Sequence, residues 1–201
     1  MAQARDVKSE GREAAVLWRR LDAPGADAAQ LGRTAGGWKV TGAAVCLQSG
    51  EIAYLRYEVT CDERWRTQRG LVVGHVGDRR IEMEVEANEK REWTVNGTPV
   101  PVVKGCIDLD LNFTPATNLI QFRRLALGVG DRAEAPAAWI KVPEFELRRL
   151  PQTLYRTSER SYDYTAPTEG YAGVLTVHPS GFVLHYPELW VADKVETAAD
   201  A

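Results

Sequence analysis

The sequence predicts an all-β protein, a single antiparallel barrel-like or half-barrel domain of roughly ten to thirteen strands with at most one or two short helices. Two observations carry this prediction. Hydrophobic residues alternate with polar residues at a period of two along much of the chain, as they do in half-buried strands. Turn-forming residues recur between these runs at the short spacing that is typical of a sandwich or barrel.

Three runs show the alternation most clearly. In residues 80–87 every second side chain from Ile81 onward is apolar and the others are Arg or Glu, which indicates a strand with one solvent-facing side. Residues 53–61 and 107–112 follow the same pattern, so we expect strands there as well.

Turn chemistry predicts how these strands connect. Hairpin turns are expected at three places where turn-forming residues separate two runs: Gly77-Asp78, Asn96-Gly97 and Pro179-Ser180-Gly181. One short helical turn is expected over residues 114–118, with Thr114 as its N-cap and Pro115 at the first helical position. Residues 20–36, rich in Ala and Gly, are predicted to form a surface loop or a loose edge segment.

No internal repeat divides the chain, so we expect one β domain over residues 13–190. Residues 1–12 are predicted to be a loose or disordered N-terminus. The small and polar residues 191–201 are predicted to be a flexible tail.

Composition limits the classes of function. The chain has 201 residues, 44% of them hydrophobic, a formal net charge of −3 and a pI of about 5.7. Proteins that bind nucleic acid or anionic membrane surfaces normally carry positive charge, so neither partner is expected. No run is long and apolar enough to span a bilayer, and the N-terminus has no secretory core, so the expected location is the cytoplasm.

The residues that often hold metals do not form a recognisable set. Cys46, Cys61 and Cys106 are too widely spaced for a zinc motif and are expected to be buried thiols; whether Cys61 and Cys106 bond stays open. His178 and His185 flank one predicted turn without a third ligand nearby, so we expect neither a metal nor a cofactor.

Two arginines lie on strand faces that the alternation of apolar and polar residues predicts to be apolar. Arg69 shares its predicted face with Leu71, and Arg123 shares its face with Leu125. A buried arginine needs a carboxylate or a ligand oxygen. Three interpretations remain open: a structural ion pair, for which Asp108 is one candidate partner and Asp110 the other; a charged group lining a ligand cavity; or simple surface exposure.

Several segments together resemble the putative glycolipid-binding family. The match covers roughly residues 13–190, and the segments that carry it are RYEVTCDERWRT (56–67), WTVNG (93–97), GCIDLDL (105–111), FTPATN (113–118), RRL (123–125), QTLY (152–155) and GFVLHYPEL (181–189). Two positions depart from the family pattern. Ala116 stands where a bulky residue is usual, and Gln121 stands where proline is usual and is expected to loosen the local turn.

The resemblance implies a barrel-like fold similar to that of the bacterial lipoprotein carriers, with a hollow that holds acyl chains or a glycolipid. We therefore expect non-catalytic binding of a lipid or glycolipid-like amphiphile in a β-walled cavity. The expected ligand-binding residues are two aromatic residues for stacking, three arginines for an anionic or hydroxylated head group, and three further polar residues: Trp65, Tyr155, Arg69, Arg123, Arg124, Asp108, Asp110 and Asn118.

Two other classes of function are weighed against this one. Asp108 and Asp110 lie two residues apart on one predicted strand, as the acid and base of a carbohydrate- or ester-active enzyme could. The sequence lacks the motifs of nucleophilic and phosphate-transfer enzymes, so no enzyme is expected. The second alternative is a structural or protein-interaction domain with no ligand. The oligomeric state is not predicted.

Overall fold

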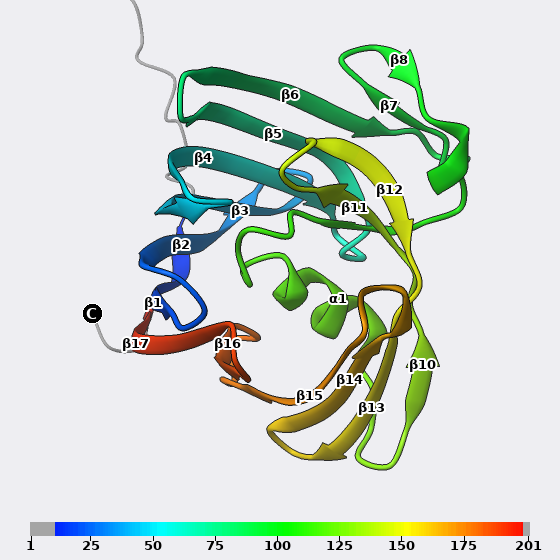
Figure 1. The fold of residues 1–201 in the computed structure, drawn as a ribbon. Coiled ribbons are helices and arrows are strands. Elements are labelled where there is room, and N and C mark those ends of the chain that lie inside the picture. Colours follow the sequence, from blue (N-terminus) through cyan, green and yellow to red (C-terminus); the bar gives the residue numbers. More distant parts are fainter. Residues whose placement is uncertain (1–10, 199–201) are drawn as a thin grey trace, which may run out of the picture.

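One long, curved antiparallel sheet forms the frame of the molecule (Figure 1). Within residues 11–198, which the computed structural model describes, the strand order of this sheet is β10-β13-β14-β15-β16-β17-β1-β2-β3-β4-β5-β6-β7-β8. The end strands β8 and β10 do not pair with each other, so the sheet is open. The predicted all-β class is confirmed, and the sheet is not closed into a barrel.

The first half of the sheet runs in chain order through hairpins. Its strands are β1 (Arg12–Arg20), β2 (Gly25–Thr34), β3 (Gly37–Gln48), β4 (Glu51–Asp62), β5 (Thr67–Val76), β6 (Arg79–Ala87), β7 (Trp93–Val95) and β8 (Thr98–Pro99). A short 3-10 turn, η1 (Pro101–Val103), follows β8. The predicted Asn96-Gly97 turn is confirmed, and both residues have the positive φ that this hairpin needs.

The second half is built from the C-terminal part of the chain. Its strands are β10 (Arg132–Glu134), β13 (Thr153–Ser158), β14 (Ser161–Ala166), β15 (Tyr171–Val177), β16 (Val183–Tyr186) and β17 (Trp190–Thr197). The 3-10 turn η2 (Pro167–Glu169) connects β14 to β15. Strand β17 pairs with β1, and this pairing joins the two halves.

An inner layer fills the concave side of the curved sheet. It consists of β9 (Asp108–Asp110), α1 (Asn118–Leu125), β11 (Ala137–Lys141) and β12 (Glu146–Leu150). The three strands form a small sheet in the order β12-β11-β9, and Figure 1 shows α1 between the two halves of the large sheet. Buried residues of this layer pack against both halves. The acyl-chain hollow that we expected is therefore occupied largely by the chain's own residues.

Four expectations about the elements differ from the structure. Residues 25–34 of the predicted loop form β2, an internal strand, because small alanines and a buried aspartate hide its alternation. Residues 191–197 of the predicted flexible tail belong to β17. The predicted helical turn begins later, at Asn118. The described residues form 17 strands, more than expected, because several have only two or three residues and show no alternation. Residues 1–10 of the predicted loose N-terminus lie outside the described residues.

A buried polar cluster ties the inner layer to the first half of the sheet. Tyr57 on β4 donates a hydrogen bond to Asp27 Oδ2 on β2 (2.8 Å), and the Thr114 hydroxyl contacts the same oxygen. Asp27 Oδ1 is buried without a hydrogen-bond partner among residues 11–198. Burial raises the pKa of Asp27 to about 6, although its hydrogen bonds to Thr114 and Tyr57 act in the opposite direction.

Candidate functional site

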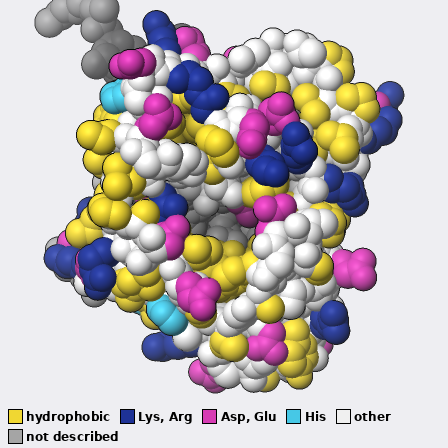
Figure 2. All heavy atoms as spheres, in the orientation of Figure 1, with side chains coloured by type: hydrophobic (Ala, Val, Ile, Leu, Met, Phe, Trp, Pro, Cys, Tyr) yellow, Lys and Arg dark blue, Asp and Glu magenta, His cyan; other side chains and the backbone are white. Residues whose placement is uncertain are grey.

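A pocket lined by aromatic and polar side chains opens between the inner layer and the C-terminal strands. Its volume is about 200 Å³. We call it the tyrosine pocket, and it is lined by Asp110, Asn112, Thr114, Pro115, Asn118, Trp139, Leu150, Tyr164, Ala166, Glu169, Tyr171, Tyr186, Leu189 and Trp190. The space-filling view of the molecule is hollowed near its middle, with acidic side chains at the rim of the hollow (Figure 2).

Three tyrosines from three neighbouring strands form one wall of this pocket. The ring centroids of Tyr164 and Tyr171 are 5.9 Å apart, those of Tyr164 and Tyr186 5.8 Å, and those of Tyr171 and Tyr186 5.2 Å. The pairing of β14, β15 and β16 brings the backbones of these three residues side by side, which places the rings in contact. Packed aromatic rings with hydroxyl groups suit ligands that have both apolar faces and hydroxyls.

The phenol groups of these tyrosines stay protonated at neutral pH. Burial raises the pKa of Tyr164 and of Tyr186 well above the ordinary value, and it raises the pKa of Tyr171 to about 12. Tyr164 donates its hydroxyl proton to Gln152 Oε1 at 2.6 Å, and Tyr171 donates to the Pro187 carbonyl at 3.0 Å. The hydroxyl protons of Tyr164 and Tyr171 are therefore already used in hydrogen bonds within the protein.

Asp110 adds a carboxylate to the pocket at the end of β9. The backbone N–H of Asn112 donates to its Oδ1 at 2.8 Å. Burial, and to a lesser extent the charge of Asp108, raises the pKa of Asp110 to about 6. At neutral pH this group is therefore mostly ionised and accepts hydrogen bonds. Glu169 also lines the pocket, and the lining contains no lysine or arginine.

Asp108, the neighbouring carboxylate, is committed to an ion pair. Arg124 on α1 donates to both of its oxygens, at 2.8 and 2.6 Å, and Gln121 Nε2 lies 3.3 Å from Oδ2. The Asp108 side chain is 3% exposed and that of Arg124 is 16% exposed. This pair locks β9 to α1, which argues against Asp108 and Asp110 acting as an acid and base pair. Gln121 lies within α1 and strengthens this contact, whereas we expected it to loosen a turn.

The other predicted residues lie apart from the tyrosine pocket. Arg69 shares a face of β5 with Leu71, as predicted, but this is the outer face, where Arg69 pairs with Glu84 (2.5 Å) and Glu58 (3.7 Å). Its predicted place on a buried face is wrong, because a bulge between β4 and β5 reverses the alternation near Thr67.

Trp65 and Tyr155 also lie outside that pocket. The Trp65 ring stacks on Trp38, with centroids 4.2 Å apart. Tyr155 is 39% exposed on β13. Arg123 lies on α1, where strand alternation does not apply, and it lines a different groove. Of the eight predicted residues, the structure places Asp110 and Asn118 in the tyrosine pocket. It also pairs Arg124 with Asp108 and places the Arg123 guanidinium 5.9 Å from the centroid of the Trp65 ring, both outside that pocket.

The pattern of the sequence did not predict the tyrosine wall. Five of the chain's seven tyrosines lie between residues 155 and 186, and this concentration was the available signal. It does not reveal which rings share a face, because the contacts join strands through pairings that are set by the fold.

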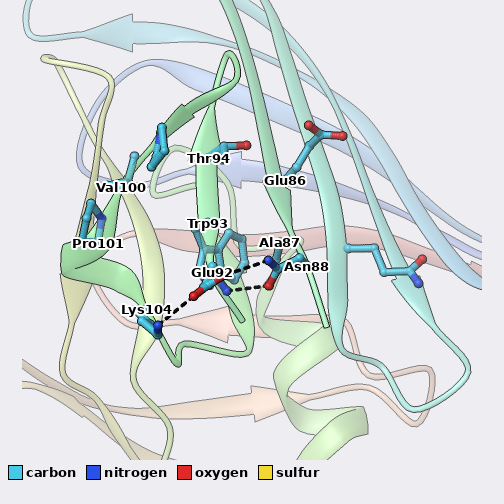
Figure 3. Close-up of a pocket in the computed structure, with 11 residues that line it drawn as sticks. Glu86, Ala87, Asn88, Glu92, Trp93, Thr94, Val100, Pro101 and Lys104 are labelled. Carbon is cyan, nitrogen blue, oxygen red and sulfur yellow. Dashed lines mark hydrogen bonds and ion pairs between the residues drawn. The ribbon is translucent and has the colours of Figure 1, made fainter. Parts of the chain in front are cut away.

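A second cleft, of about 530 Å³, lies at the edge of the sheet beside β6, β7 and η1. Figure 3 shows the Glu92 carboxylate between two partners: Lys104 Nζ at 2.8 Å and Asn88 Nδ2 at 3.0 Å. The buried Trp93 donates its indole N–H to the Cys106 carbonyl at 3.0 Å. In this cleft, Glu92, Lys104 and Asn88 therefore bind one another.

Within residues 11–198 no group of three or more His, Cys, Asp or Glu side chains is placed to hold a metal ion. The three cysteines are buried, as expected, and none of them forms a disulfide, which answers the question left open for Cys61 and Cys106. The same part of the chain contains no helix long and apolar enough to cross a bilayer.

The fold and the pocket define a class, the all-β proteins with an open curved sheet and a pocket against its concave side. Over residues 15–192 the chain matches the family described as Putative glycolipid-binding, and it belongs to that family. Membership supports a role in binding in general.

One solved structure, of a DUF1089 family protein from Pseudomonas aeruginosa, matches with a TM-score of 0.68 and 24% sequence identity. The match covers 94% of this chain and 97% of that chain. At this identity the likeness shows the shared fold. No curated protein matches the chain.

Proposed function

We propose that this protein binds, without chemical turnover, an amphiphile whose hydroxylated head group, such as a sugar ring, enters the tyrosine pocket. The observation that carries the proposal is the convergence of the tyrosine wall and the Asp110 carboxyl group in one pocket. Aromatic faces pack against the C–H faces of a sugar, and the carboxylate and amide groups accept and donate hydrogen bonds to its hydroxyls. The family description supports the same class of ligand.

The charge of the pocket favours an uncharged head group. Asp110 and Glu169 line it without any lysine or arginine, so an anionic head group would meet repulsion in a partly desolvated site. The volume of about 200 Å³ suits a single ring better than an acyl chain. The pocket is smaller than the ~300–1,000 Å³ typical of drug-sized sites, so the apolar tail would extend outside it.

Calorimetric titration with octyl glucoside tests the proposal, with an ethylene glycol ether of the same alkyl chain as the matched ligand. The glucoside should bind and the ether should bind at least about tenfold more weakly, because a hydrogen bond to a charged group contributes ~1.5–3 kcal/mol. The Asp110→Asn variant keeps the acceptor for the Asn112 N–H and should lose about tenfold in affinity for the glucoside. Equal binding of both ligands would reject head-group recognition.

Activity assays on the same protein test the alternative that it is an enzyme. Incubation with chromogenic glycosides and esters should give no turnover above that of buffer. Turnover that disappears in Asp110→Asn would replace the binding role by a catalytic one.

A further inference from the structure

A groove lined by three arginines lies where the C-terminal end of α1 meets the turns that follow β13 and β15. Its volume is about 580 Å³. We call it the arginine groove, and it is lined by Phe122, Arg123, Ala126, Arg156, Glu159, Arg160, Tyr162, Val177, His178, Pro179 and Gly181. It shares no lining residue with the tyrosine pocket.

Two of the arginines are fixed in place by backbone carbonyls. Arg123 donates from Nε and Nη2 to the Ser180 carbonyl, at 3.2 and 2.8 Å, and from Nη2 to the Pro179 carbonyl at 3.2 Å. Arg156 donates to three carbonyls, of which the closest is that of Leu127 at 2.6 Å. These contacts position the guanidinium groups before any ligand arrives, which lowers the entropy cost of binding.

The positive charge of the groove is not neutralised. Among residues 11–198 no carboxylate lies within ion-pair distance of Arg123, Arg156 or Arg160, and no hydrogen bond engages Nη1 of Arg123 or the Arg160 side chain. Three arginines face one glutamate, Glu159, in a chain whose net charge is −3. Guanidinium groups with spare N–H donors bind phosphate and carboxylate oxygens in pairs of hydrogen bonds.

The base of the groove is apolar. The rings of Phe122 and Tyr162 pack with centroids 4.7 Å apart, and the Arg156 guanidinium lies over the Tyr162 ring at 5.6 Å. Val177 is buried beside them. A ligand that contacts both the arginines and this apolar base has an apolar body next to its negative charge.

We propose that the arginine groove is a second binding site, for a small organic anion whose phosphate or carboxylate group is attached to an apolar ring or short chain. The anion is held by Arg123, Arg156 and Arg160, and its apolar body packs against Phe122 and Tyr162. This site is separate in place and in charge preference from the pocket proposed for the hydroxylated head group.

Fluorescence titration of the full chain with three naphthalene probes tests this proposal. The probes are 1-naphthyl phosphate, 1-naphthoate and the uncharged 1-naphthalenemethanol. At least one anion should bind, about tenfold or more tightly than the alcohol, and the stronger of the two identifies the preferred group. Added inorganic phosphate should compete with the phosphate probe. Absence of binding at millimolar concentration, or equal binding of the alcohol, would overturn the proposal.

Three variants locate the binding. Arg160→Gln removes a charge from a side chain that holds no other part of the protein, so the fold should be preserved and the affinity should fall several-fold. Arg156→Gln should weaken binding about tenfold. Arg148→Gln, the matched control, removes an exposed arginine on β12 that pairs with Glu146, and it should leave the affinity unchanged.

Asp110→Asn separates this site from the tyrosine pocket. It should leave probe binding unchanged, whatever its effect on a glucoside. If probe affinity is the same in the wild type and in Arg160→Gln and Arg156→Gln, or is changed by Asp110→Asn, the anion does not bind in the arginine groove.

Discussion

The buried Asp27 makes the stability of the fold depend on pH in a direction opposite to that of a typical aspartate. Replacing it by asparagine preserves its size and allows contacts with the hydroxyls of Tyr57 and Thr114, while removing its ability to ionise. Because Asp27 Oδ1 has no partner within residues 11–198, the ionised form is poorly solvated. The Asp27→Asn variant should therefore be the more stable protein at neutral pH.

The size of the effect follows from the pKa of Asp27, which burial raises from an ordinary value of 3.8 to about 6. The native state then binds more protons than the unfolded state between these two pH values. Its free energy of unfolding consequently falls as the pH rises through this window, and it stays lower above pH 6. Because a pKa change of one corresponds to ~1.4 kcal/mol, this rise in the pKa lowers the free energy of unfolding by about 3 kcal/mol at high pH relative to low pH.

Urea unfolding followed by tryptophan fluorescence measures this difference. The stability of Asp27→Asn relative to the wild type should increase by about 2.5 kcal/mol between pH 4 and pH 7.5, slightly less than the full effect because the unfolded carboxyl is already partly ionised at pH 4. Contributions from other titrating groups cancel in the comparison. Asp78→Asn, at an exposed turn residue, is the control and should show no such change. If the difference in the free energy of unfolding between Asp27→Asn and the wild type does not vary with pH, the pKa of Asp27 is not raised by burial.

Three further predictions concern other parts of the structure. Glucoside affinity should fall as the pH drops through about 6, where Asp110 becomes protonated, and Asp110→Asn should show a flat profile in calorimetry. Asp108→Asn should lower the free energy of unfolding by ~3–5 kcal/mol, because it leaves the nearly buried guanidinium of Arg124 unpaired. Arg69→Gln, on the outer face of the sheet, should lower it by at most ~1 kcal/mol. Urea unfolding measures both differences. Gly74→Ala should unfold at a clearly lower temperature, because its φ is +154° and the new Cβ would lie 1.9 Å from a backbone carbonyl of β4.

Local chemistry made part of the fold predictable. Asn96-Gly97 specifies a tight hairpin through its own backbone preferences, and the alternation around Ile81 follows from one buried face of one strand. Strand β2 could not be recognised in this way. Its inward positions include Asp27, and a carboxylate is compatible with burial only through partners that lie far away in the sequence.

The candidate site was less predictable, because its side chains converge through long-range pairing. Asp110 was identified from its own strand, but Tyr164, Tyr171 and Tyr186 form a wall only when β14, β15 and β16 are aligned. The β-bulge near Thr67 could not be predicted from the sequence either. Its one extra residue moves Arg69 to the outer face, but the alternation of apolar and polar residues does not show where such a residue lies.

The pairing of β1 with β17 also has a consequence for how the chain folds during synthesis. Most neighbours in the large sheet are consecutive hairpins, which can form as soon as both strands have emerged from the ribosome. The first strand, however, keeps one edge without its partner until the last strand has been made. Closing so long a loop is slow, and an exposed strand edge invites pairing with other chains. Newly made chains that lack β17 should therefore aggregate more readily than the complete protein.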